Sequence, residues 1–372
     1  MNKKIILVDQ IAKINYKYTF SLVNELLNNG VDVKLVLDMK ENDECKCDTY
    51  NIFLTDEKNV SKLKKVRNLF TSYKKIRQII KQEKIDTLHI QWINFSPIEY
   101  HLLKRIAKKT KIVMTVHDIL PFNEKKYDKH FYRKIYRLPS KLIIQAKSNM
   151  ERFNSLFPEY ADKTIYIPLG NFLKYAEVHD VKESREKLNI DLNKFTFLFF
   201  GQIKVIKGVD TLLEAFSLFH KKYPDTQLVV AGKTWKADEE LYKEIISRNN
   251  LTENELKWDI RFIPDEDLGY YYSASDIVVL PYKDLYQSGV VQLVYAFGKC
   301  PIVSDLPSFL EVVDENTGYI FKSKDVDSLY QKMEQAYLNK ANNNSLAKVG
   351  YKKIEENFSW VKIAKDIINN CY

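Results

Sequence analysis

The chain has 372 residues, of which 45% are hydrophobic, and its formal net charge is +9. This length is too great for one compact core and fits two domains, and the hydrophobic content argues against long disordered segments. No apolar run reaches the roughly 20 residues that a membrane-spanning helix needs. The four cysteines, at positions 45, 47, 300 and 371, are too few and too scattered for a disulfide framework, so we expect a reducing cytoplasm.

The positive charge is concentrated in the first half of the chain. Residues 1–170 hold 32 Lys or Arg against 19 Asp or Glu, whereas residues 171–372 hold 26 against 30. Such a basic half faces either nucleic acid or an anionic membrane surface. Because no nucleic-acid-binding motif is present, we favour a membrane or an anionic lipid-linked substrate. Residues 57–84 predict a basic amphipathic helix, which is either an ordinary surface helix or one that touches lipid.

Strands and helices are predicted to alternate through the first half, which favours right-handed parallel units. Ligands of open parallel sheets gather at the carboxyl ends of the strands. Trp92 follows one predicted strand, and His117 and Asp118 follow another, where the two can exchange protons if His117 keeps its ordinary pKa near neutrality. A structural histidine and a helix-capping aspartate are the alternative. The predicted strands are residues 4–8, 31–37, 51–54, 87–90, 111–116, 140–146 and 164–167, and residues 19–28 predict a helix after the loop 9–18.

The segment FLFFGQIKVIKGVDTLLEAF, residues 197–216, joins an apolar strand to a helix through a polar loop. Gly201 ends the strand, and the loop contributes Gln202, Lys204 and Lys207. Lysine side chains and the free N–H groups of a helix N-terminus both attract an anion, so this loop predicts an anion site. An ordinary strand-turn-helix with solvated lysines is the alternative.

The alternation of strands and helices continues to the end of the second half. Residues 173–194 are charged, contain a short helix near 182–188 and predict an interdomain linker. Further strands are predicted at 227–230, 260–263 and 276–280, and helices at 241–249 and 267–274.

Four stretches contain the most specific motifs: TVHDILPFN (115–123), GQIKVIKGVD (201–210), FIPDEDLGYYYSASDIVVLPY (262–282) and QSGVVQLVYAFGKCPIVSD (287–305). They resemble motifs of nucleotide-sugar glycosyltransferases of the two-domain GT-B type, in particular the bacterial, family 4-like glycosyl transferases group 1. The resemblance covers most of residues 195–321 and only patches of residues 1–194.

The resemblance implies an α/β fold with two Rossmann-like parallel-sheet domains that face a cleft. Residues 1–170 would form the acceptor-binding domain and residues 171–352 the nucleotide-sugar-binding domain. Residues 353–372 would form a C-terminal helix that crosses back to the first domain.

The resemblance also implies transfer of a hexose-type sugar from a nucleoside diphosphate to an acceptor, here a lipid-linked surface polysaccharide intermediate. The protein would need neither metal nor other cofactor and would lie peripherally on the cytoplasmic face of the membrane. His117, Asp118 and Lys207 would be catalytic, and Trp92 and His117 would bind the acceptor. The donor would bind Gly201, Gln202, Lys204, Lys207, Gly232, Ile263, Pro264, Ser288 and Gly289.

One departure from the family concerns two glutamates that retaining members usually carry eight positions apart. This chain has no Glu between Glu266 and Glu311. The stereochemical outcome therefore stays open, and a non-catalytic GT-B-like partner subunit is the alternative function. The matching positions fall at Leu285 or Tyr286 and at Leu293 or Val294.

Two other classes of protein are disfavoured by spacing. The ten glycines never form G-x-G-x-x-G or the P-loop motif, which argues against a dehydrogenase and a P-loop nucleotidase. A metal-dependent transferase would need an Asp-x-Asp pair at a strand end. The pairs 265/267 and 325/327 precede predicted helices, so we interpret them as helix caps.

Overall fold

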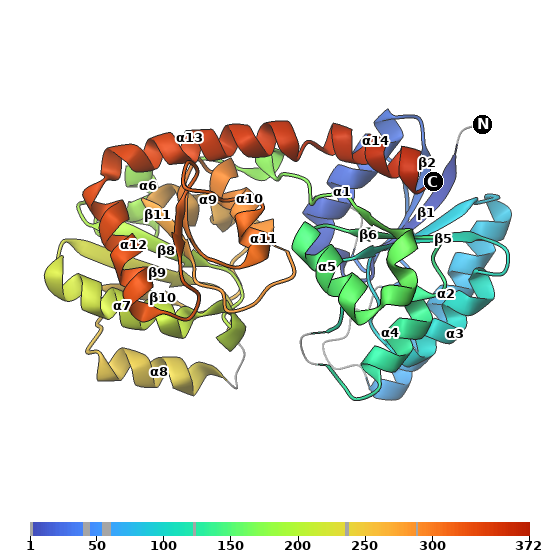
Figure 1. Ribbon diagram of the computed structural model, residues 1–372, viewed down its shortest axis with the longest axis horizontal. Helices are drawn as coiled ribbons and strands as arrows, with labels where there is room; N and C mark the ends of the chain where they lie inside the picture. Colours follow the sequence, from blue (N-terminus) through green and yellow to red (C-terminus); the bar gives the residue numbers. More distant parts are fainter. Residues whose placement is uncertain (1–2, 40–44, 54–60, 122–123, 235–237, 288) are drawn as a thin grey trace. The chain divides into compact units, whose positions relative to one another are not determined.

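The computed structural model describes residues 3–39, 45–53, 61–121, 124–234, 238–287 and 289–372. Contacts within the chain divide it into two units, one comprising Met1–Gly170 with Phe358–Tyr372 and the other Asn171–Asn357. Each unit contains one parallel sheet with helices against it (Figure 1). The predicted α/β architecture with two parallel-sheet domains is therefore confirmed. Within the described ranges, every helix is too short or too polar to span a membrane.

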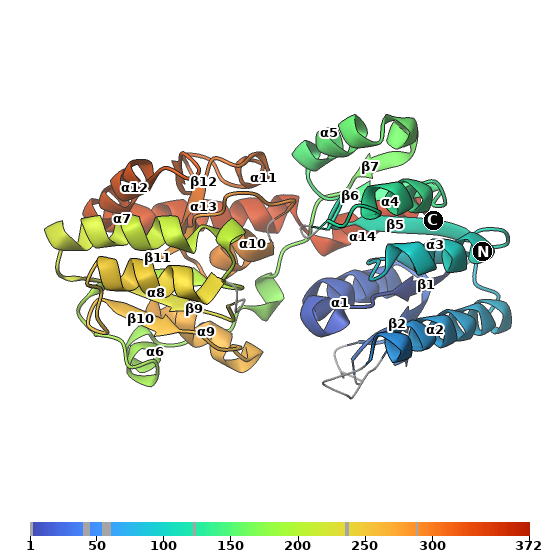
Figure 2. The same ribbon diagram turned by 90° about the horizontal axis from the view of Figure 1, so that it is seen from below.

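The first unit is built on a seven-stranded sheet in the order β3-β2-β1-β4-β5-β6-β7. Its central strands are almost entirely buried, as expected for a parallel sheet covered on both faces. Helices α2 and α3 lie side by side, and α14 lies along α1 (Figures 1 and 2). The elements are β1 (Lys4–Val8), α1 (Ala12–Asn28), β2 (Asp32–Val36), β3 (Asp48–Tyr50), α2 (Lys62–Gln82), β4 (Thr87–Ile90), α3 (Ser96–Ile106), β5 (Lys111–Val116), α4 (Asp128–Tyr136), β6 (Lys141–Ile144), α5 (Lys147–Leu156), η1 (Pro158–Lys163), β7 (Thr164–Tyr166) and α14 (Trp360–Asn370).

Two local predictions for this unit are wrong. Helix α1 begins at Ala12, seven residues earlier than expected. Of residues 12–17 only Ala12 is buried, so the first turns of the helix show no apolar face in the sequence. Strand β3 precedes the predicted range 51–54, because its backbone pairs with β2 only from Asp48 to Tyr50. Residue 54 lies outside the described part of the chain.

The second unit is built on a six-stranded sheet in the order β10-β9-β8-β11-β12-β13. Helix α7 lies beside α8 and α12. The elements are η2 (Leu173–Tyr175), α6 (Val181–Lys187), β8 (Phe195–Phe200), η3 (Val205–Lys207), α7 (Val209–Lys222), β9 (Thr226–Ala231), α8 (Glu239–Arg248), β10 (Leu256–Asp259), α9 (Asp265–Ala274), β11 (Ile277–Leu280), α10 (Gly289–Ala296), β12 (Cys300–Ser304), α11 (Pro307–Leu310), β13 (Tyr319–Phe321), α12 (Val326–Leu338) and α13 (Lys340–Asn357).

The strand predicted at residues 260–263 is wrong. Strand β10 ends at Asp259, because its pairing with β9 stops where Asp259 meets Ala231. Residues 260–263 therefore form part of the loop that leads to Pro264 and α9.

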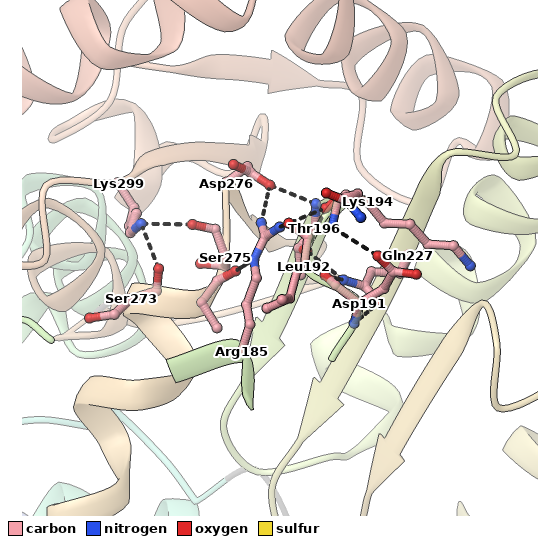
Figure 3. A network of polar contacts seen from close by, with 12 residues as sticks. Arg185, Asp191, Leu192, Lys194, Thr196, Gln227, Ser273, Ser275, Asp276 and Lys299 are labelled. Atoms are coloured by element: carbon pink, nitrogen blue, oxygen red, sulfur yellow. Dashed lines mark hydrogen bonds and ion pairs between the residues drawn. The ribbon is translucent and has the colours of Figure 1, made fainter. Parts of the chain in front are cut away.

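Residues 173–194 are part of the second unit rather than a free linker, because the buried Arg185 fixes them to the amino ends of the strands (Figure 3). Its Nε donates to the carbonyl of Ala274 at 3.0 Å, and its Nη2 pairs with Asp276 at 2.9 Å. Asp276 also accepts from the backbone N–H of Thr196 at 2.7 Å. A buried guanidinium needs such partners, so this network holds α6 against the sheet.

Candidate active site

The loops after β8 and β11 flank the point at which the strand order of the second unit reverses. Doubly wound sheets bind their ligands beside this point, outside the carboxyl ends of the strands. Gly201, Gln202, Lys204 and Lys207 all belong to the loop after β8. The segment predicted as an anion site thus lies where the topology favours a ligand.

Lys207 is held in this loop by the aromatic ring of Tyr282, which follows β11. Its Nζ lies 3.8 Å from the ring centroid, a cation–π contact on a buried tyrosine. The next residue, Lys283, donates its backbone N–H to the carbonyl of Ile206 at 2.8 Å and pairs its ammonium with Asp210. Two strand-end loops are therefore joined, and a half-buried cation is fixed between them.

Glycine is required at two places where these loops approach one another. Gly208 has φ +69°, and a Cβ there would lie 1.8 Å from the carbonyl oxygen of Pro281. Gly232 has φ +143°, and a Cβ there would lie 1.9 Å from the carbonyl oxygen of Gly201. The backbone after β8 is thus pressed against the loops after β9 and β11, and α7 begins directly afterwards at Val209.

The other described residues that were predicted to bind the sugar donor lie at the same edge of this sheet. Gly232 follows β9, and the half-buried Ile263 and Pro264 lie between β10 and α9. Gly289 is the first residue of α10. Ser288 lies outside the described residues.

The positions of the paired family glutamates are occupied by side chains that pack inside the second unit. Leu285 and Tyr286 are buried, and so is Val294 on α10. The carbonyl of Tyr286 accepts from the hydroxyl of Ser308 at 2.8 Å. These positions therefore contribute packing, and any contact that the family glutamates make with the sugar donor must be made here by other residues.

In the first unit, Trp92 and His117 form a stacked pair at the carboxyl ends of β4 and β5. Their ring centroids are 4.3 Å apart with an interplanar angle of 8°. His117 Nε2 donates to Gln91 Oε1 at 2.8 Å, and the edge of Tyr18 meets the His117 ring at 5.1 Å. Trp92, His117 and the half-buried Asp118 line one cavity of about 110 Å³.

The expectation of a near-neutral pKa for His117 is wrong. Burial, reinforced by the nearby His89, lowers the pKa of His117 to about 3, and a hydrogen bond with Gln145 opposes this only in part. Burial likewise lowers the pKa of His89 to about 3. Both rings are neutral at physiological pH, because water is excluded from the charged form. His117 is therefore suited to hydrogen bonding and poorly suited to taking a proton.

One buried polar atom of this pair, Trp92 Nε1, has no hydrogen-bond partner within the described residues, and it can only donate. Buried polar groups are nearly always paired, so this unpaired donor indicates room for a polar ligand. The oxygen of a hydroxyl group can accept from it.

Sequence reasoning missed Asp9, which directly follows β1 and is fully buried. Burial raises its pKa to about 6, although the hydroxyl of Thr19 donates to it and the N–H of Ile11 does so at 3.0 Å. Gln91, Gln145 and Tyr18 were also missed. The available signal for Asp9, Gln91 and Gln145 was a polar residue at the end of an apolar strand, whereas Tyr18 lies in α1.

Within the described residues, no group of three or more His, Cys, Asp or Glu side chains is placed to hold a metal ion. Asp265 and Asp267 lie in the first turn of α9. Asp325 caps α12 by accepting from the N–H of Ser328 at 3.0 Å. The two Asp-x-Asp pairs thus both belong to helix N-termini.

The two parallel sheets and their strand orders define the GT-B class of fold. Sucrose-phosphate synthase from Thermosynechococcus elongatus has a similar structure, with TM-score 0.78 and 18% identity over 99% of this chain and 98% of that one. The Anabaena protein HepE, solved in complex with UDP, has TM-score 0.74 and 17% identity over 98% of both chains.

Sequence comparison finds one family match in each unit. Residues 180–353 match glycosyl transferases group 1, and residues 4–146 match glycosyl transferase 4-like proteins. Spore coat protein SA of Bacillus subtilis is 22% identical over 315 residues, which are 78% of this chain and 79% of that protein. The chain is thus a glycosyltransferase of the GT-B type whose second unit resembles glycosyl transferases group 1 and whose first unit resembles glycosyl transferase 4-like proteins, as the sequence motifs indicated.

Proposed function

We propose that the protein transfers a hexose-type sugar from a nucleoside diphosphate donor to the hydroxyl of a lipid-linked surface polysaccharide intermediate. The observation that carries the donor half is the placement of Lys204 and Lys207 at the strand reversal of the second unit. The complex of the similar HepE with UDP supports a nucleotide donor. The family and the fold support transfer chemistry.

The second unit supplies the positive charge that a diphosphate leaving group requires. Lys207 is prepositioned by Tyr282, and the N-terminus of α7 adds free N–H groups. When the sugar–phosphate bond breaks, negative charge grows on the diphosphate, and a fixed cation stabilises it without reorganisation. Lys204, at the start of the 3-10 turn η3, would share this role.

The first unit supplies neutral hydrogen-bonding groups that suit an acceptor alcohol. Trp92 and His117 would orient the hydroxyl, using the Trp92 N–H that has no partner within the described chain. Because His117 is neutral and weakly basic, the proton of that hydroxyl passes to Asp118, the carboxylate that lines the same cavity. His117 then orients, and Asp118 is the base.

The reaction as proposed needs no metal ion and no other cofactor. Two lysines replace the divalent cation that metal-dependent transferases place on the diphosphate. Turnover should therefore persist in excess EDTA. A complete loss of turnover that Mg²⁺ or Mn²⁺ reverses would contradict this part of the proposal.

Calorimetry with UDP-, GDP- and dTDP-sugars, followed by turnover measurements with the donor that binds, tests the function as a whole. Binding of one donor with transfer to a lipid-linked glycan supports it. Because Leu285 and Tyr286 stand where relatives carry a glutamate, a non-catalytic partner subunit is the second candidate. Donor binding without transfer to any acceptor would favour that candidate.

A peripheral position on the cytoplasmic face of the membrane forms part of this proposal. Helix α2 contains no acidic residue, and it exposes Leu63 by 85% and Phe70 by 48% among its lysines and arginines. Such a mixed apolar and cationic face suits an anionic lipid surface. The lipid-linked acceptor would then be met where it resides.

A further inference from the structure

Two hollows lie beside α3 in the first unit, and the larger, of about 780 Å³, is lined by cations from α2 and α3. Figure 2 shows these two helices side by side. The cations recur three or four residues apart, so those of one helix gather on one of its faces. They are Lys74, Arg77 and Lys81 on α2, with Arg105, Lys108 and Lys109 at and just beyond the end of α3.

The positive charge of this hollow is not balanced within the part of the chain that the structure describes. No Asp or Glu is among the described lining residues, and no described carboxylate forms an ion pair with any of the six cations. Other lysines of the same unit do have such partners, as Lys34 has Asp48 at 2.7 Å. Like charges at these spacings repel one another, and a bound anion offsets that repulsion. The hollow is therefore complementary to an anionic group.

The second hollow, of about 550 Å³, is mainly apolar and shares Arg105 and Lys108 with the first. Its apolar walls are Phe70, Pro97, Ile98, Leu102 and Phe131. The exposed Leu63 lies seven residues before the exposed Phe70, and therefore on the same face of α2. Cations beside exposed apolar side chains suit a phospholipid, whose anionic headgroup adjoins apolar chains. A free phosphate would use the cations alone.

The cationic hollow lies at the opposite edge of the sheet from the candidate acceptor site. Ile85 and Thr110, which line it, come just before β4 and β5, whereas Trp92 and His117 follow the carboxyl ends of the same strands. The six residues of β5 separate Thr110 from His117, which is about 20 Å of extended chain. A molecule bound in the hollow therefore leaves the candidate acceptor site open.

We propose that the cationic hollow between α2 and α3 binds the phosphate of an anionic phospholipid, and that the neighbouring apolar hollow faces the acyl chains. The inference rests on the membrane position in the proposed function, and it adds the place and the chemistry of the contact. The bound lipid is an anchor and not the acceptor, because it lies at the other edge of the sheet. Membrane binding then depends on α3 as well as on α2.

Two adjacent lysines on α2 form a matched pair that tests the site. Both are exposed, but Lys74 lines the hollow and Lys75 is not among its lining residues. The probe is vesicles of an equimolar mixture of phosphatidylcholine and phosphatidylglycerol at low salt. Lys74→Glu changes the charge of the site by two, so we expect binding to weaken about 30-fold. Lys75→Glu should weaken binding by less than about fivefold. Equal losses in the two variants would indicate a diffuse charged surface and overturn the inference.

Arg105→Gln with Lys108→Gln tests whether α3 takes part. Both side chains are exposed, so these substitutions should leave the fold intact. Because the variant removes two cations from the hollow, we expect it to bind the same vesicles about 30-fold more weakly than the wild-type protein. Unchanged vesicle binding in this variant would mean that α2 acts alone, and the site between the helices would be wrong.

Phe70→Ala and a competing polyanion test whether the occupant is a lipid. Phe70→Ala removes an exposed apolar side chain and keeps every cation, so vesicle binding should weaken about tenfold, while calorimetric binding of soluble glycerol phosphate stays unchanged. Unchanged vesicle binding would show that the phosphate alone is recognised and would overturn the lipid. Single-stranded RNA that binds more tightly than the vesicles, at equal phosphate concentration and ionic strength, would assign the cations to a nucleic acid instead.

Calorimetry of the wild-type protein with nucleoside diphosphate sugars separates this inference from the proposed function. We expect the protein to bind both a donor sugar and the phosphatidylglycerol vesicles. Donor binding without vesicle binding would overturn the lipid site alone. Vesicle binding that depends on Lys74, in a protein that binds no donor, would support the lipid site and contradict the proposed function.

Discussion

The two units present opposite kinds of chemistry at equivalent places in their sheets. At the carboxyl edge of the first unit, the candidate groups are buried, neutral and bonded to one another, as His117 and His89 show. At the carboxyl edge of the second, the groups are cations on loops, such as Lys204 and Lys207, held by backbone geometry and one aromatic ring. One edge suits hydroxyls, and the other suits an anion.

This contrast runs against the distribution of charge along the chain. The basic half contains the neutral site, while the half with a slight excess of acidic residues contains the cationic one. Net charge therefore describes the surface of each half rather than its site. Each side of this contrast can be tested by substitution.

The neutral histidines of the first unit should make the protein sensitive to acid. His89 and His117 have folded pKa values near 3, against about 6.5 when unfolded, so below pH 6.5 the unfolded chain binds the extra protons. Stability is complete above that pH and falls as pH drops toward 3, by about 2 to 3 kcal/mol per histidine at pH 4.5. Asp9 opposes this in part, because its raised pKa adds stability as pH falls from 6 to 4.

Urea unfolding of the full chain between pH 4.5 and 7.5 measures this effect. We expect the free energy of unfolding to fall less with decreasing pH in His117→Gln, whereas His130→Gln, at an exposed position, should leave this pH dependence unchanged. An equally steep pH dependence in His117→Gln and in the wild-type protein would mean that the site of the first unit is not a neutral network.

Lys207→Ala should nearly abolish transfer while the fold survives. By analogy with a lost donor in an oxyanion hole, one missing cation costs about 3 kcal/mol, or 10² to 10³ in turnover. Lys204→Ala should be milder, because the cation that lies over the Tyr282 ring is Lys207. Turnover and donor calorimetry measure the loss, and an active Lys207→Ala protein with normal donor affinity would place the diphosphate elsewhere.

Gly208 and Gly298 form a matched pair that tests whether backbone packing holds the cationic loop. Both have positive φ, +69° and +65°, but only at Gly208 would a Cβ collide with a neighbour, Pro281. Gly298→Ala should cost the strain of a left-handed residue, about 1 kcal/mol, and preserve donor affinity. Gly208→Ala should cost at least twice as much and weaken donor binding tenfold or more. Equal effects in the two variants would show that the close approach is unimportant.

The second unit was more predictable from the sequence than the first because its candidate site is local. Lys204, Lys207 and Gly208 lie within five residues, so one contiguous motif predicted both the loop and the anion site that we propose there. The first unit builds its polar site from separate strand ends, and Tyr372 meets His89 across 283 positions. The sequence around His117 gives no sign that this side chain is buried, so its pKa was mispredicted.

The smallest effect concerns the surface charge of the first unit. If that charge serves a membrane, the protein should bind anionic vesicles more tightly than neutral ones, and added salt should weaken the binding because charges are screened over about 8 Å at physiological ionic strength. Removing two cations from α2, by Lys74→Gln with Arg77→Gln, should reduce binding by about 1 kcal/mol per charge at low salt and by less at physiological salt.

The matched control removes two exposed cations from α13, by Lys348→Gln with Lys352→Gln, and should leave vesicle binding unchanged. The cations of α2 are not offset by any acidic residue on that helix, and they are separate from the neutral site beside β4 and β5. Turnover on a water-soluble acceptor should therefore survive the α2 substitutions. Equal binding to both kinds of vesicle would remove the membrane from the proposal while leaving the contrast between the two sites untouched.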